Sequence, residues 1–147
     1  MKCGEYKIEI GCGNDKSEGF IGIDISENSD ADIIRDIKDG LPFCDNSAEY
    51  VKAISILEHF DNDNFVKVMK EIWRVLKNKG ILEIVVPDSM TDKGFKDPTH
   101  KMHFTRATFS YFEPDSPKQI LYKFPPFKTI YRENINGEFL FKLEVVK

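Results

Sequence analysis

The chain has 147 residues, enough for one hydrophobic core, and we expect a single domain over residues 1–147. Its apolar content of 41% and charged content of 31% are typical of a globular protein, and its net charge of −4 argues against a general nucleic-acid binder. No apolar run approaches the ~18 residues of a membrane helix, and no apolar signal-peptide core follows Met1. These features predict a cytoplasmic protein with neither a membrane nor a nucleic-acid partner.

The first half of the chain predicts four short strands. The first two are apolar at nearly every position, as strands buried on two faces are. Only a short run from Gly11 to Gly19 separates them, so either an extended parallel crossover or a hairpin can join them. The four strands are expected over residues 6–10, 20–25, 31–35 and 50–55.

The second half predicts one strong helix, a fifth strand, a short helix and a hairpin. Asp61 or Asn62 can cap the strong helix, and Gly80 is expected just past its end. The strand is expected over residues 81–86 and the short helix from Thr105 to residue 112. The Asn-Gly pair at 136–137 predicts a hairpin of residues 127–133 and 138–146. The apolar positions of the strong helix recur at helical spacing: Phe65, Val68, Met69, Ile72, Trp73 and Leu76.

This order of elements predicts an α/β fold. We expect a Rossmann-like, mostly parallel sheet with a C-terminal antiparallel hairpin and reduced helices on the N-terminal half. One face of the first strands would then lack helical cover, which predicts a possible homodimer. The uncovered residues are expected to be Phe20, Ile21, Ile23, Ile33 and Ile34.

The cysteines predict no covalent or metal cross-link. Cys3, Cys12 and Cys44 are odd in number and widely spaced. In a reducing compartment such cysteines are usually free thiols. We therefore expect reduced thiols rather than a disulfide or a zinc site.

A glycine-punctuated turn at the end of the first strand predicts a cofactor site. Gly11 and Gly13 let a ligand approach the backbone, and Asp24 at the tip of the next strand can accept hydrogen bonds from ribose hydroxyls. A dinucleotide site is disfavoured because Lys16 stands where a third glycine is needed and the acid comes too soon. S-adenosylmethionine has a ribose but no phosphate, so it suits this site.

Several segments resemble class I S-adenosylmethionine-dependent methyltransferases, over about residues 6–112. The stretch Ile-Glu-Ile-Gly-Cys-Gly at 8–13 looks like the first motif of that family. Segments 40–47, 56–60, 75–80 and 86–88 resemble its later landmarks in the right order. The short first loop and Asp-Pro-Thr-His-Lys-Met-His-Phe-Thr at 97–105 resemble a compact type 11-like bacterial and archaeal subgroup, often tied to cell-surface sugar pathways.

The resemblance implies roles in cofactor binding. It places Glu9 near the cofactor ammonium and Asp36 at the adenine amino group, with Asp39 as an alternative to Asp36. From the residues alone, a carboxylate in a buried strand needs a partner, either the cationic ligand group or a nearby Lys or Arg. The expected cofactor site comprises Glu9, Gly11, Cys12, Gly13, Asp24, Ile25, Asp36, Ile37, Ile54 and Ser55.

Three histidines are the candidates for a general base, because imidazole titrates near neutral pH. They are His59, His100 and His103. Asp97 with the latter two is not a standard ligand spacing, so no metal is expected. The pattern favours a methyltransferase acting on a small-molecule or sugar-like acceptor. The alternatives are a non-catalytic S-adenosylmethionine-binding module that needs a partner chain and, less favoured, a nicotinamide-dependent oxidoreductase.

Overall fold

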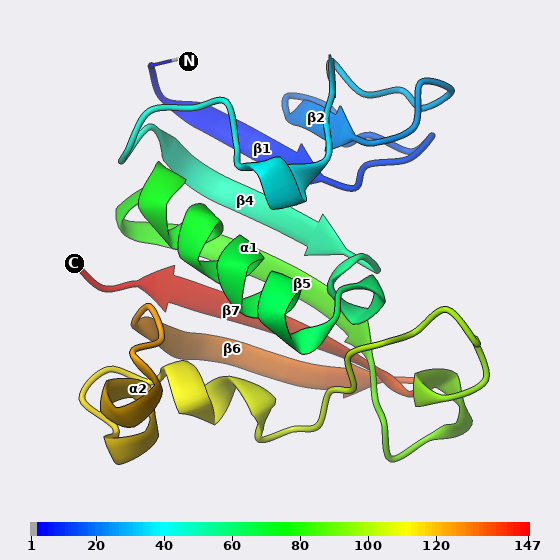
Figure 1. Cartoon of the computed structure of the whole chain (residues 1–147), viewed down its shortest axis with the longest axis vertical. Coiled ribbons are helices and arrows are strands. Elements are labelled where there is room, and N and C mark those ends of the chain that lie inside the picture. The colour runs from blue at the N-terminus through cyan, green and yellow to red at the C-terminus, as the bar shows by residue number, and fades with distance from the viewer. Residues whose placement is uncertain (1–2) are drawn as a thin grey trace.

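The computed structural model describes residues 3–147, which form a seven-stranded sheet (Figure 1). The strand order is β3-β2-β1-β4-β5-β7-β6, parallel from β3 to β5, with β7 antiparallel to both of its neighbours. This confirms the predicted fold class. The strands are β1 Tyr6–Ile10, β2 Ile21–Asp24, β3 Ile33–Ile34, β4 Ala48–Ile54, β5 Leu76–Pro87, β6 Phe127–Ile135 and β7 Glu138–Val145.

The first two strands run side by side in the same direction. Ile8 pairs with Ile21, and Ile10 pairs with Ile23. The connection between them is therefore an extended parallel crossover and not a hairpin. Because the carboxyl ends of parallel strands meet at one edge of a sheet, the bend at Gly11 lies beside the end of β2.

The main helix, α1, spans Asn62–Val75, and the Asp61 side chain caps it by accepting from the backbone N–H of Asn64 at 2.8 Å. The expectation for its end was wrong. The chain passes directly into β5, so Gly80 lies inside a strand and caps no helix. The extra residues are absorbed where the β4–β5 register shifts, and Lys79 there has a left-handed φ of 65°.

The remaining helices are short. The helix expected from Thr105 is a 3-10 helix, η4, over Thr108–Phe112. Helix α2, Pro117–Tyr122, was not predicted; Ser116 caps it by accepting from the N–H of Gln119. Within residues 3–147, no helix has both the length and the apolar character needed to cross a bilayer. The other 3-10 turns are η1 Ile37–Asp39, η2 Leu57–His59 and η3 Asp92–Gly94.

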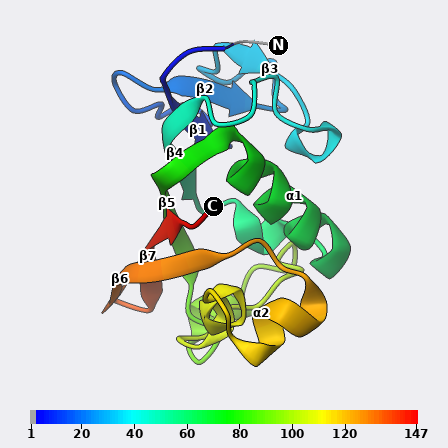
Figure 2. The same ribbon diagram turned by 90° about the vertical axis from the view of Figure 1, so that its left-hand side faces the viewer.

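Helices α1 and α2 lie on the same side of the sheet (Figure 2). Side chains alternate along a strand, so Ile21 and Ile23 of β2 lie on one face of the sheet. Ile23 is fully buried in the core, and Ile21 and Ile33 pack against the same cluster. The expectation of an uncovered residue was therefore wrong for Ile23, whereas Ile21 and Ile33 are only partly buried and Ile34 is 47% exposed.

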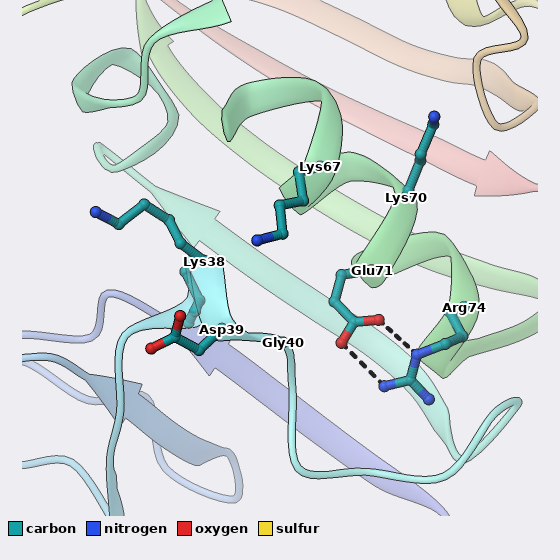
Figure 3. Close-up of a pocket in the computed structure, with 8 residues that line it drawn as sticks. Lys38, Asp39, Gly40, Lys67, Lys70, Glu71 and Arg74 are labelled. Atoms are coloured by element: carbon teal, nitrogen blue, oxygen red, sulfur yellow. Dashed lines mark hydrogen bonds and ion pairs between the residues drawn. The ribbon is translucent and has the colours of Figure 1, made fainter. Parts of the chain in front are cut away.

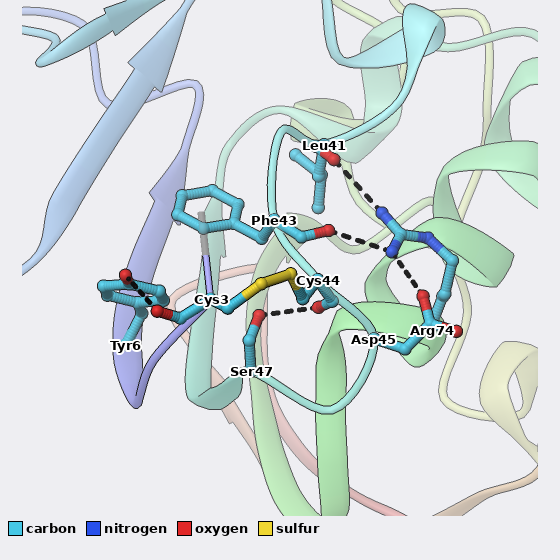
Figure 4. Close-up of a disulfide and its surroundings, with 8 residues drawn as sticks. All are labelled: Cys3, Tyr6, Leu41, Phe43, Cys44, Asp45, Ser47 and Arg74. Carbon is cyan, nitrogen blue, oxygen red and sulfur yellow. Dashed lines mark hydrogen bonds and ion pairs between the residues drawn. A yellow bond between two sulfur atoms is a disulfide. The ribbon is translucent and has the colours of Figure 1, made fainter. Parts of the chain in front are cut away.

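A disulfide joins Cys3 to Cys44, with Cα atoms 5.1 Å apart (Figure 4). The expectation of reduced thiols was wrong for these two residues, and Cys12 is free and buried. The pairing arises because β1 and β4 are parallel neighbours, so the segments that precede them meet at one edge of the sheet. Tyr6 also donates its hydroxyl to the Cys3 carbonyl at 3.0 Å.

The segment that carries Cys44 is fastened to α1 by Arg74 (Figure 4). The Arg74 guanidinium donates to the carbonyls of Leu41 at 3.1 Å and Phe43 at 2.9 Å, and pairs with the Asp45 carboxylate at 2.6 Å. Glu71 on the same helix pairs with Arg74 at 2.5 Å. Hydrogen bonds to Glu71 raise the pKa of Arg74, so this cation stays charged throughout the usual pH range.

Candidate functional site

A cavity of about 210 Å³ lies at the carboxyl ends of β1 and β2. Six of its lining residues belong to the predicted site: Gly11, Asp24, Ile25, Asp36, Ile37 and His59. Sequence reasoning missed five others: Ile23, Arg35, Lys38, Ile56 and Phe60. Residues from three separate loops thus converge on one cavity, where the sequence predicted a nucleoside.

Gly11 is required by both its backbone and its surroundings. It has a left-handed φ of 64°, and its N–H donates to the Ile23 carbonyl at 2.7 Å. A Cβ at this position would lie 2.2 Å from Cδ1 of Ile56, which lines the same cavity. The absent side chain therefore leaves room for Ile56 at the cavity wall.

Asp24 joins the glycine bend to the end of β2. Its Oδ2 accepts from the N–H of Gly13 at 2.9 Å, and its Oδ1 accepts from the N–H of Ser26 at 2.8 Å. An ionised carboxylate offers about four acceptor positions. One position on each oxygen is thus still free for a vicinal diol such as that of a ribose.

Glu9 lies outside the cavity lining and closes the loop beneath it. It is 5% exposed, and its Oε2 accepts from the N–H of Ser17 at 2.7 Å. Lys52, opposite Glu9 on β4, donates to the Ser17 hydroxyl at 3.0 Å. A loop amide, rather than a direct Lys or Arg partner, therefore satisfies one oxygen of Glu9. Burial and the nearby carboxylates raise the pKa of the Cys12 thiol, which keeps it neutral.

The two alternative adenine acids separate in space. Asp36 lines the 210 Å³ cavity and accepts from the N–H of Lys38 at 3.0 Å. Asp39 is exposed and lines a different cavity of about 600 Å³ between η1 and α1, together with Lys67 and Lys70 (Figure 3). The geometry therefore favours Asp36 over Asp39 as a cofactor contact.

A neighbouring cavity of about 390 Å³ lies at the carboxyl ends of β4 and β5. His59 lines both this cavity and the 210 Å³ cavity, so the two are adjacent. Ser55 reaches it from a left-handed φ of 53°, whereas Ile54 ends β4 without lining either cavity. The walls are largely polar: Ser55, Glu58, His59, Pro87, Lys93, Lys96, Asp97, His100 and Glu138.

The three candidate histidines do not gather at one point. The rings of His59 and His100 meet edge to face, with centroids 5.1 Å apart. His103 is exposed, stacks on Phe95 with centroids 4.2 Å apart, and lines a third cavity. Hydrogen bonds from Thr99 lower the pKa of Asp97, which lies 3.5 Å from His100.

Sequence reasoning missed Glu58 in the cavity of about 390 Å³, along with Pro87, Lys93, Lys96 and Glu138. Glu58 is 3% exposed, and one carboxylate oxygen, Oε2, has no hydrogen-bond partner. Burial raises the pKa of Glu58, while its own N–H and the imidazoles of His59 and His100 oppose the rise. The sequence signal that could have identified Glu58 is the position of an acid within the apolar run that follows β4.

Comparison with known proteins identifies the class. A family model described as "Methyltransferase domain" matches residues 8–84, more than half of the chain. The chain therefore belongs to this family. The family and the fold together indicate a class I methyltransferase with S-adenosylmethionine as its cofactor.

Solved structures share the fold at low sequence identity. An S-adenosylmethionine-dependent methyltransferase from Archaeoglobus fulgidus is 16% identical with a TM-score of 0.67, over 97% of this chain and 86% of that one. A chain of a Haloferax volcanii complex that contains the Trm112 methyltransferase activator is 14% identical with a TM-score of 0.69. The match covers 100% of this chain and 84% of that one. The [4+2]-cyclase SpnF is 14% identical with a TM-score of 0.70, over 98% of this chain and 76% of that one. This fold is therefore not confined to methyl transfer.

One curated relative shares a short segment. An uncharacterized protein of Methanocaldococcus jannaschii is 50% identical over 46 residues. The match covers 31% of this chain and 19% of that protein. It therefore links the two sequences through one segment and gives no information about the rest of the relative.

Proposed function

We propose that this chain transfers a methyl group from S-adenosylmethionine to a small-molecule or sugar-like acceptor. The observation that carries the proposal is the meeting of Gly11, Asp24 and Asp36 in one cavity that shares His59 with a second, polar cavity. The first would hold the nucleoside, and the second would hold the acceptor. Polar groups such as Lys93 suit an acceptor rich in hydroxyls.

The chemistry needs alignment more than activation. The bond between sulfur and methyl breaks as the bond between methyl and acceptor forms, and the sulfonium becomes a neutral thioether. The acceptor hydroxyl or amine gives its proton to a base or to water. Because sulfonium is an activated leaving group, positioning the two molecules supplies most of the rate enhancement. His59 and His100 lie where the acceptor would be, and His103 does not.

A second candidate is a cofactor-binding module that needs a partner chain. The 210 Å³ cavity is smaller than the roughly 300–1,000 Å³ of typical ligand sites, which favours a site completed by a further protein surface. Within the described residues 3–147, the sheet face opposite α1 carries no helix that could cover it (Figure 2). A second copy of the chain is one such partner, and light scattering would detect it.

Calorimetry separates these functions. Titration with S-adenosylmethionine should give a 1:1 isotherm, and titration with NAD should give no heat; heat with NAD alone would overturn the proposal. Asp36→Ala should weaken cofactor binding, while the matched variant Asp39→Ala should leave it unchanged. Release of S-adenosylhomocysteine in the presence of hydroxylated acceptors would establish catalysis. Tight binding without release for any acceptor would favour the partner-dependent module.

A further inference from the structure

Three side chains that accept hydrogen bonds converge beside the acceptor cavity. One ligand atom from each of Glu58, His59 and His100 lies within 4.8 Å of the other two. The cluster is built by neighbouring elements, because Glu58 and His59 lie on η2 and His100 lies in the loop after β5. The Glu58 carbonyl accepts from the N–H groups of Lys101 at 2.8 Å and Met102 at 3.0 Å, which fixes that loop against η2.

Neighbouring oxygen atoms hold Nδ1 of both rings. Thr99 gives its hydroxyl proton to Asp97 at 2.7 Å, so its oxygen can only accept from Nδ1 of His59, 3.3 Å away. Nδ1 of His100 lies 3.4 Å from the Gly94 carbonyl, to which it can only donate. Each neutral ring therefore carries its proton on Nδ1 and its unshared electron pair on Nε2, which in His100 lies 3.5 Å from Oδ2 of Asp97. Metal-binding histidines commonly donate their other N–H in this way.

Glu58 supplies an independent indication of a ligand. Its Oε2 is buried without a hydrogen-bond partner, although nearly all buried polar atoms in proteins have one. Glu58 is only 3% exposed, so solvent does not supply the missing hydrogen bond. A carboxylate oxygen and two imidazole nitrogens thus lie within 4.8 Å of one another, and a single cation would interact favourably with all three.

We propose that Glu58, His59 and His100 bind one divalent transition-metal ion such as Zn²⁺. Two imidazoles and one carboxylate are the protein ligands of many catalytic zinc sites, which keep further coordination positions open. Bond lengths of about 2.0–2.2 Å place tetrahedral ligands roughly 3.4 Å apart. Rotation of His59, which is exposed, can close the cluster from 4.8 Å. Asp97, 3.5 Å from His100, lies where a further oxygen could join the shell.

The open positions of the ion would face the cavity that holds Lys93 and Lys96. An acceptor bearing adjacent oxygen atoms could bind the ion there, and coordination would lower the pKa of its hydroxyl. This consequence rests on the proposed function. It also excludes a general-base role for His59 and His100, since a metal-bound nitrogen has no pair with which to take a proton.

The site is tested with the metal alone. Co²⁺ is titrated into tag-free, chelator-treated protein and followed by visible absorption, with Zn²⁺ competition by calorimetry. We expect one ion per chain and at least a tenfold loss of affinity in Glu58→Gln and His100→Gln. The matched control His103→Gln removes the third histidine of the chain, and its affinity should be unchanged. His100→Gln, in a loop, keeps the test decisive if Glu58→Gln does not fold.

Three results would overturn the metal site. They are the absence of saturable binding, wild-type affinity in both cluster variants, and an equal loss in His103→Gln. Titration with S-adenosylmethionine separates this inference from the proposed function. Metal binding without cofactor binding would support the metal site and overturn the methyltransferase proposal. Cofactor binding without metal binding would support the methyltransferase proposal and overturn the metal site.

Discussion

Replacing Gly11 by alanine should damage the cofactor site more than the fold. The residue has a φ of 64°, and holding an L-residue there costs about 1–2 kcal/mol. For a domain of 147 residues, that strain corresponds to a melting temperature lower by about 2–8 °C. The new Cβ would also lie 2.2 Å from Cδ1 of Ile56. Ile56 must rotate to relieve this contact, and it lines the cavity of about 210 Å³.

Gly19→Ala is the matched control. Gly19 lies in the same loop with a φ of 79°, but a Cβ there would meet no heavy atom within 4 Å. Both variants should therefore lose thermal stability by circular dichroism, and Gly11→Ala at least as much as Gly19→Ala because its Cβ also meets Ile56. Only Gly11→Ala should lose affinity for S-adenosylmethionine, by at least about tenfold, or 1.4 kcal/mol, in calorimetry. Adding Ile56→Ala removes the clashing atoms and should restore part of that affinity.

Two outcomes would refute this reasoning. Wild-type affinity in Gly11→Ala would mean that the cavity beside Ile56 is not the cofactor site. An equal loss in Gly19→Ala would mean that backbone strain in the loop, rather than the blocked cavity, controls binding. In either case the assignment of the glycine bend would fail, while the fold would be unaffected.

Three further predictions concern the site and its scaffold. Asp24→Asn leaves one acceptor oxygen where both carboxylate oxygens of Asp24 accept hydrogen bonds. Calorimetry should then give about 10- to 100-fold weaker cofactor binding, and unchanged affinity would contradict a ribose contact. Reducing the Cys3–Cys44 bond, which spans a sequence separation of 41, should lower the free energy of unfolding in urea by about 3–4 kcal/mol. Because Cys12 is buried, thiols are counted in protein denatured without reductant, and three titratable thiols there would argue against the bond. Burial of Glu71 opposes ionisation, but hydrogen bonds from Arg74 prevail and lower the pKa of Glu71 below its usual 4.5. Arg74→Gln should therefore lower the free energy of unfolding by roughly 1–2 kcal/mol at neutral pH, and this loss should shrink as pH falls below about 4.5. A difference in melting temperature between variant and wild type that did not change with pH would contradict this sign.

Local patterns predicted most of the fold. The apolar run of β1, the helical spacing in α1 and the Asn-Gly turn before β7 each reflect interactions within a few residues. The same logic failed at Gly80, because the register shift between β4 and β5, and not a helix cap, decides its conformation. Cys3 and Cys44 were misjudged for a similar reason. Their proximity depends on the adjacency of β1 and β4, which no local pattern encodes.

The cofactor residues were predictable to the extent that they end strands. Gly11 and Asp24 follow neighbouring parallel strands, and such ends meet at one edge of the sheet. Ile56 was missed because its contact with Gly11 crosses from β4 to β1 and carries no sequence signature. Glu9 was predicted as a partner for the cofactor ammonium, yet a loop N–H satisfies one of its oxygens. That contact depends on how the crossover loop folds back.

The histidines illustrate what spacing alone cannot decide. His100 and His103 are close in sequence, but the chain between them donates two N–H groups to the Glu58 carbonyl and so turns the two rings apart. His59 meets His100 only because β4 and β5 are parallel neighbours, whose carboxyl ends bring η2 and the following loop together. Glu58 is then buried against them without a partner for Oε2. A base that must accept a proton needs one accessible imidazole, and it gains nothing from an unpartnered buried carboxylate beside it. A cation uses all three groups, so the burial of Glu58 is the feature that favours metal binding over general-base catalysis at this position.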